Sequence, residues 1–245
     1  SDPLNFAGAD SLINNGLFDQ QVDGSFRLWN GVGLFDNRGT LGKSGGDADL
    51  VIRTPLINRV GALLLADSGR IVYGNDSTFE AGSRLLGAGW HVFSSGNDTF
   101  SFGGDFVGNG RVLFEAGTYL ATAPTRPLSP LVTFSGGTFR GSWGVASDSV
   151  MRATAGGSKY IQGAFTNEGS VVWATSDPLN FAGAGSLLNR GLFDQQADGS
   201  FRLWNGGAVF DNAGTLRKSA GEGDLYINMP LVNRAGAALE SDSGR

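Results

Sequence analysis

The sequence predicts an all-β protein, a parallel β-solenoid (β-helix) with turns of about 22 residues that stack into a rod of about 11 turns. Three observations predict this fold class: a composition rich in Gly and Phe, a long internal repeat, and a shorter period inside that repeat. Strand-like alternation of apolar residues recurs along the chain, and we find no convincing helical periodicity over ten residues.

The composition favours strands and tight turns around an apolar interior. Gly accounts for 40 of the 245 residues, and charged residues make up only 17 %, against about 25 % in typical domains. The 17 Phe and 5 Trp are too many for a disordered Gly-rich linker. The chain therefore has enough apolar side chains for a continuous core.

Charge and residue usage also exclude several function classes. The chain has no Cys and one His, so disulfides, thiolate metal sites and a Ser-His-Asp triad are not expected. A net charge of −5 argues against a nucleic-acid partner. Because no stretch approaches 18 consecutive apolar residues, we expect no membrane insertion of this segment.

The long period is 175 residues. Residues 176–245 repeat residues 1–70 without a gap, and 50 of the 70 aligned positions are identical. We interpret 1–175 as one complete long repeat of about eight turns and 176–245 as the first three turns of the next, in one continuous solenoid. Such arrays provide reach, surface or polymerisation more often than catalysis, and this chain is expected to be a window of a longer array.

The short period comes from the pattern apolar-x-Asn-x-Gly-x-apolar, whose Asn residues recur at spacings of 21 to 23. An Asn amide at a corner can bond the equivalent amide in the next turn, and a Gly two residues later permits a positive φ. The residues assigned to this turn ladder are Asn14, Asn37, Asn58, Asn167, Asn189, Asn212 and Asn233.

Two other all-β architectures stay open on this pattern. A propeller has blades of about 40–50 residues, which would pair these units, and an array of sandwiches is also compatible. One segment departs from the period: residues 121–130 hold three of the seven prolines, so we expect them to leave the ladder as a loop.

Few residues point to chemistry. Trp29 and its copy Trp204 lie in the unchanged string GSFRLWNG; we expect both in the core, the alternative being an exposed ring that stacks on sugar. Gly-Asn-Asp segments near 74–76 and 95–105 echo calcium-binding nonapeptides but are isolated, so turns without a cofactor are expected, with calcium as the alternative. Carboxylates such as Asp49 and its copy Asp224 lie beside Gly at turns, and we assign no catalytic residue and expect no enzyme.

The units Phe35–Leu41 and Phe210–Leu216 resemble the repeats of large bacterial surface proteins, the filamentous-haemagglutinin-like and autotransporter-type adhesins. The resemblance implies a right-handed, secreted or cell-surface β-helix that serves as an adhesive or presenting stalk, with a host or neighbouring-cell surface and its glycans as partners. One alternative is a filament subunit that self-associates through the solenoid ends. The other is a β-helix that binds or cleaves polysaccharide.

Overall fold

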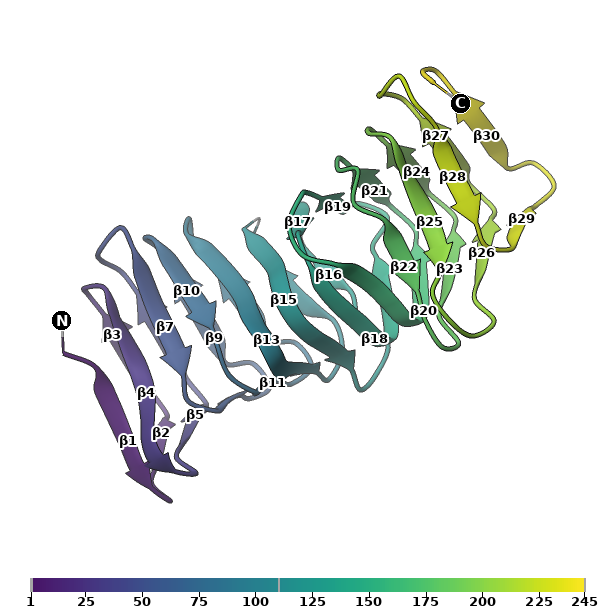
Figure 1. Ribbon diagram of the computed structural model, residues 1–245. Coiled ribbons are helices and arrows are strands. Elements are labelled where there is room, and N and C mark those ends of the chain that lie inside the picture. Colours follow the sequence, from purple (N-terminus) through teal and green to yellow (C-terminus); the bar gives the residue numbers. More distant parts are fainter. Residues whose placement is uncertain (1, 110, 245) are drawn as a thin grey trace.

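The computed structural model describes residues 2–109 and 111–244, which form strands, turns and bends and no helix. The strands pair in parallel and stack into a β-solenoid of about 11 turns of about 22 residues, so the predicted fold class is confirmed. Figure 1 shows the two termini at opposite ends of the stack. The described residues contain no helix that could cross a membrane. The right-handedness implied by the resemblance stays a prediction.

Each turn contributes one strand segment to each of three parallel ladders. Ladder 1 contains β1 (Leu4–Gly8), β4 (Gly24–Gly31), β7 (Asp49–Arg53), β10 (Arg70–Tyr73), the first parts of β13 (Trp90–Phe102) and β15 (Val112–Ala121), β17 (Leu131–Phe134), β19 (Val150–Ala153), β21 (Ser170–Trp173), β24 (Leu192–Gln195), β27 (Thr215–Lys218) and β30 (Ala238–Ser241).

Ladder 2 follows one corner later in each turn. It contains β2 (Ser11–Asn14), β5 (Leu34–Asn37), β8 (Leu56–Asn58), β11 (Ser77–Phe79), the second parts of β13 and β15, the first parts of β18 (Gly137–Val145) and β20 (Lys159–Asn167), β22 (Leu179–Phe181), β25 (Gly199–Leu203) and β28 (Leu225–Asn228).

Ladder 3 completes the turn. It contains β3 (Leu17–Gln20), β6 (Thr40–Lys43), β9 (Leu63–Ala66), β12 (Arg84–Leu86), β14 (Phe106–Gly108), β16 (Pro127–Leu128), the second parts of β18 and β20, β23 (Ser186–Asn189), β26 (Val209–Asn212) and β29 (Leu231–Asn233). An isolated bridge between Thr125 and Trp143 is where the N-terminal part of this ladder meets β18.

The core is a column of side chains that stack from turn to turn. Inward residues alternate with outward ones along the strands, and in ladder 1 the register places Tyr73, Phe93 and Phe114 directly above one another. Their rings stack at centroid distances of 4.9 and 5.2 Å. A turn cannot bury these rings alone, so each turn is stabilised by its neighbours.

Copied strands of the two long repeats occupy different ladders. Strands β1 and β4 belong to ladder 1, but their copies β22 and β25 belong to ladder 2. In the same way β2 of ladder 2 is copied as β23 of ladder 3, and β3 of ladder 3 as β24 of ladder 1. The chain returns to ladder 1 eight times between β1 and β21 before β22 enters ladder 2. The long repeat therefore spans eight and one third turns, where the sequence indicates about eight.

The boundary between the copies, after residue 175, does not interrupt the stack. Strand β20 of the first copy pairs with both β22 and β23 of the second, and β21 pairs with β24. The proline-rich segment 121–130 behaves differently from the prediction. Pro127–Leu128 pairs with β14 as strand β16, because a strand at the end of the N-terminal part of ladder 3 can lack one N–H donor.

Candidate functional site

The predicted turn-ladder asparagines form two hydrogen-bonded rows at different corners of the solenoid. In the first row Asn14 Nδ2 donates to Asn37 Oδ1 at 2.8 Å, and Asn37 Nδ2 donates to Asn58 Oδ1 at 2.7 Å. This row lies at the ends of ladder 2 strands and finishes on the Ser83 hydroxyl. The second row lies at the ends of ladder 3 strands and links Asn167, Asn189, Asn212 and Asn233 at 2.7 to 2.8 Å. Asn189, Asn212 and Asn233 are the copies of Asn14, Asn37 and Asn58, so the one-third turn per repeat explains their change of corner. Asn167 belongs to the first copy and already lies at the second corner.

The Gly of the Asn-x-Gly pattern has a different role from the one expected. Gly39 and Gly214 do not have a positive φ. A Cβ at Gly39 would lie 2.1 Å from the Gly16 carbonyl oxygen in the adjacent turn, and one at Gly214 would lie 2.2 Å from that of Gly191. Gly is required here because the turns approach closely. The positive φ occurs at Gly61 and Gly236, in the copies with one inserted residue.

Several charged groups form ion pairs between adjacent turns. Asp36 is buried and accepts hydrogen bonds from Arg59 and Arg38, which together lower its pKa to about 2. The copy of this contact joins Arg234 to Asp211 at 2.6 Å. Lys43 is fully buried and its Nζ lies 3.0 Å from Asp23. These pairs hold one turn to the next.

The carboxylates and turn segments singled out in the sequence also form ion pairs or hydrogen bonds within the chain. Asp49 pairs with Arg70 at 2.7 Å, and Asp224 accepts a hydrogen bond from the Tyr226 hydroxyl. In the nonapeptide-like segments, Asp76 accepts the Thr99 N–H, and Asp98 accepts the Ser95 hydroxyl. Within residues 2–109 and 111–244, no three His, Asp or Glu side chains gather in a way that could hold a metal ion.

His91 lies in the core. Its Nδ1 faces the Tyr73 hydroxyl at 2.9 Å, and its Nε2 lies 2.9 Å from the Leu86 carbonyl oxygen. A carbonyl only accepts, so Nε2 carries the proton and Nδ1 accepts from Tyr73. Burial lowers the pKa of His91 to about 4, which leaves a neutral, hydrogen-bonded core residue at pH 7.

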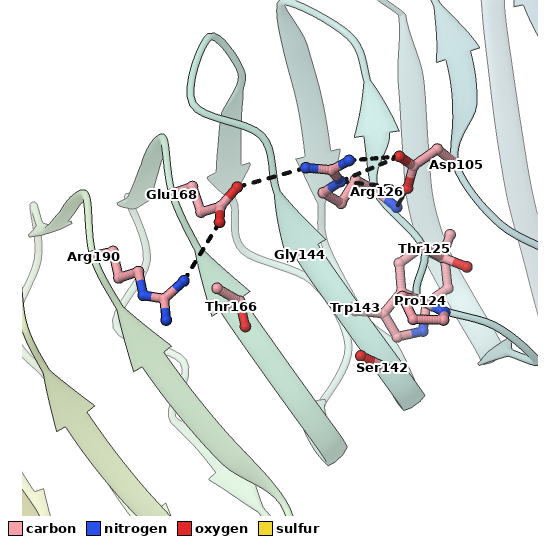
Figure 2. A pocket seen from close by; sticks show the side chains of 10 residues that line it. All are labelled: Asp105, Pro124, Thr125, Arg126, Ser142, Trp143, Gly144, Thr166, Glu168 and Arg190. Carbon is pink, nitrogen blue, oxygen red and sulfur yellow. Dashed lines mark hydrogen bonds and ion pairs between the residues drawn. The ribbon is translucent and has the colours of Figure 1, made fainter.

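A hollow of about 390 Å³ marks the break in ladder 3 (Figure 2). The proline-rich segment forms one side, where Thr125 N–H donates to Ser142 O at 2.9 Å and Gly144 N–H donates to Thr125 O at 3.0 Å. The indole of Trp143 is buried beneath and donates to the Tyr119 carbonyl oxygen. The segment 121–130 thus closes the gap between the two parts of ladder 3.

The charged groups of this hollow neutralise one another. Figure 2 shows Arg126 between Asp105 and Glu168, with Arg190 on the far side of Glu168. Arg126 lies 2.8 Å from Asp105 and 3.6 Å from Glu168, and Arg190 lies 3.7 Å from Glu168. The hydrogen bond to Asp105 is the main reason that the pKa of Arg126 is raised. The network spans the junction and leaves each guanidinium with a carboxylate partner.

The two repeated tryptophans lie on the surface, so the expectation of core positions was wrong. Trp29 is 74 % exposed and Trp204 is 66 % exposed, whereas Phe26, three residues before Trp29, is buried. Phe26 and Trp29 face opposite sides because three residues separate them on an extended strand. Trp29 follows the course of ladder 1 and Trp204 that of ladder 2, so the two rings point in different directions around the rod axis.

Trp204 has spatial neighbours that could not be identified from the sequence. Its ring lies 6.3 Å from that of Tyr160 in an edge-to-face arrangement with an interplanar angle of 89°. Beside it, a shallow depression of about 320 Å³ is lined by Arg140, Gln162, Ala182, Gly183 and Asn205. Arg140, Tyr160 and Gln162 lie in the part of the long repeat that occurs once in this chain. No motif pointed to them, because register across turns brings them together.

No family model, curated protein or solved structure matches this chain.

Proposed function

We propose that this chain is a structural and adhesive segment of a secreted or cell-surface bacterial protein, in which it forms an elongated stalk with a binding surface along its length. One observation carries the proposal: the strand ladders continue across the boundary between the copies through β20, β22 and β23. Further copies would add length to the same body, which is the property that a stalk requires.

The surface supports the same proposal. The repeated tryptophans are exposed on the sides of the solenoid, while the phenylalanines lie in the core or pack against it. The resemblance of the Asn-x-Gly units to adhesin repeats supports a location outside the cell for such a stalk. In that setting its partners are a host or neighbouring-cell surface.

The stalk is tested by small-angle scattering on the present chain and on a longer one in which a second copy of residues 1–175 precedes residue 1. The added copy contributes eight and one third turns, so the maximum dimension should increase by about 40 Å at a rise of about 4.8 Å per turn, with an unchanged cross-section. A wider particle, or two separate compact bodies, would contradict the proposal. A length that grows with protein concentration would instead support end-to-end filaments.

The extracellular location is tested separately. Antibodies raised against this chain should label intact cells of the source organism without permeabilisation. Labelling that requires permeabilisation would remove the surface role and leave the rod dimensions unaffected.

A further inference from the structure

We infer that the depression beside Trp204 is a binding site for an acidic carbohydrate, a sugar that carries a carboxylate such as a uronic acid. The inference rests on the proposed surface role and names its ligand class. It is carried by the aromatic pair Trp204–Tyr160, the guanidinium of Arg140 and the side-chain amides of Gln162 and Asn205.

The register explains how these residues meet. On ladder 2, Arg140 lies beside Gln162, and Ile161, Phe181 and Leu203 are stacked in successive turns. Ala182 and Trp204 each come one position after this stack. Ala182 lies in the turn between Gln162 and Trp204, and the Trp204 ring contacts Tyr160 two turns away. The result is an aromatic wall, Trp204 and Tyr160, next to a depression that Arg140, Gln162, Ala182, Gly183 and Asn205 line.

The wall suits a sugar ring. The C–H groups on one face of a pyranose pack on an indole face, and Trp204 offers that face to solvent at 66 % exposure. Tyr160 meets the indole at a right angle, so it limits the rotamers of Trp204 and adds a second aromatic edge. Less side-chain entropy is then lost on binding than with a lone exposed tryptophan.

The polar residues of the site supply hydrogen-bond donors and acceptors for sugar hydroxyl groups. Asn205 Oδ1 accepts the Gly183 N–H at 2.7 Å, which orients the amide and directs its Nδ2 donor away from that bond. Gln162 is exposed and presents both a donor and an acceptor to hydroxyl groups. The backbone turn at Gly183 has a φ of 66° and is fixed by the same asparagine.

Arg140 favours an acidic ligand over a neutral one. It is exposed, lines the depression, and makes no ion pair with a described residue. Several other arginines also lack an ion pair, so the position of Arg140 in the depression is what distinguishes it. A guanidinium binds a carboxylate through two parallel hydrogen bonds. Arg202, in register with Asn180 and Tyr160 on the same ladder, adds a second positive charge to this face.

The chain contains a matched control. Trp29 lies in the same string GSFRLWNG, and Asn30 accepts the Gly8 N–H as Asn205 accepts that of Gly183. Trp29 is as exposed as Trp204 but makes no aromatic ring contact in the described part of the chain. A general affinity of exposed tryptophan for sugar would therefore affect both rings equally.

The experiment is a titration of the full chain with a galacturonic acid trisaccharide and with a neutral galactose trisaccharide of equal length. Two-dimensional NMR of the indole N–H signals reads out each tryptophan, and the Trp29→Ala and Trp204→Ala variants assign two of the five signals. We expect the acidic trisaccharide to shift the Trp204 signal and not that of Trp29. Trp204→Ala should weaken binding at least tenfold, and Trp29→Ala should change it less than twofold.

Arg140→Gln separates charge recognition from stacking. Trp29, Trp204 and Arg140 are all exposed, so the three variants leave the core intact. We expect Arg140→Gln to weaken acidic-sugar binding about tenfold and to abolish the preference over the neutral trisaccharide. The inference is overturned if neither sugar shifts the Trp204 signal at millimolar concentration, if the two tryptophan variants weaken binding equally, or if Arg140→Gln leaves the preference unchanged. None of these results would alter the scattering dimensions, so the site can fail while the stalk stands.

Discussion

Replacing Asn37 by Ala should strongly destabilise the chain, because it removes the middle of the first asparagine row. Asn37 is fully buried, accepts a hydrogen bond from Asn14, and donates to Asn58 Oδ1 at 2.7 Å and to the Leu63 carbonyl oxygen at 3.2 Å. Three hydrogen bonds at about 1 kcal/mol each disappear, and polar partners remain unpaired in the interior. We expect the free energy of unfolding to fall by about 3 to 4 kcal/mol.

The matched control is Asn233→Ala in the second row. Asn233 is exposed, accepts from Asn212, and donates to the Ala237 carbonyl oxygen at 3.3 Å. Water can replace these bonds, so we expect a loss of about 1 kcal/mol or less. Equilibrium urea unfolding followed by far-UV circular dichroism measures both variants. Hydrogen exchange of the turns around residue 37 adds a local readout, since solenoid turns depend on their nearest neighbours. Equal losses in the two variants would refute the reasoning.

Two further predictions concern the core and the corners. The unfolded chain protonates His91 near its ordinary pKa of 6.5, whereas burial holds the folded pKa at about 4, so the unfolded state binds more protons between these values. The free energy of unfolding should therefore fall by about 3 kcal/mol as the pH drops from 6.5 to 4. Urea unfolding of the His91→Gln variant, measured across this pH range, should lack this pH dependence. An identical pH dependence in the variant would exclude His91 as its source. Gly39→Ala should lower the melting temperature steeply because its Cβ would lie 2.1 Å from a backbone oxygen, whereas Gly16→Ala, with nothing within 4 Å of its Cβ, should leave it nearly unchanged. Similar melting temperatures for the two variants would contradict the close-approach explanation.

The fold class could be predicted because the Asn-x-Gly units record the length of a turn directly in the sequence. The shift of one ladder per repeat could not. Between residues 90 and 145, strands β13, β15 and β18 each run through a corner, and the Asn-x-Gly pattern that would mark one does not occur there. Without those marks the number of strand segments in the long repeat cannot be counted from the sequence, and about eight turns is the nearest estimate.

The candidate site was only partly visible in the sequence, for a related reason. The odd spacing between Phe26 and Trp29 shows that the two side chains face opposite sides, but not which side is the interior. Arg140, Tyr160 and Gln162 are ordinary surface residues until the register of β18, β20 and β25 sets them beside Trp204. Parallel stacking joins residues about 20 or 40 positions apart, and such pairs have no local signature.

The shift of one ladder per repeat also sets the valency of an array that continues this sequence. Equivalent residues would return to the same side only after three repeats, or 25 turns, which correspond to about 120 Å of rod at 4.8 Å per turn. A flat receptor-bearing membrane would meet one copy in three, and bivalent attachment to it would need receptors spaced by that distance. Soluble polymers or neighbouring rods, which approach from every direction, would have access to all copies.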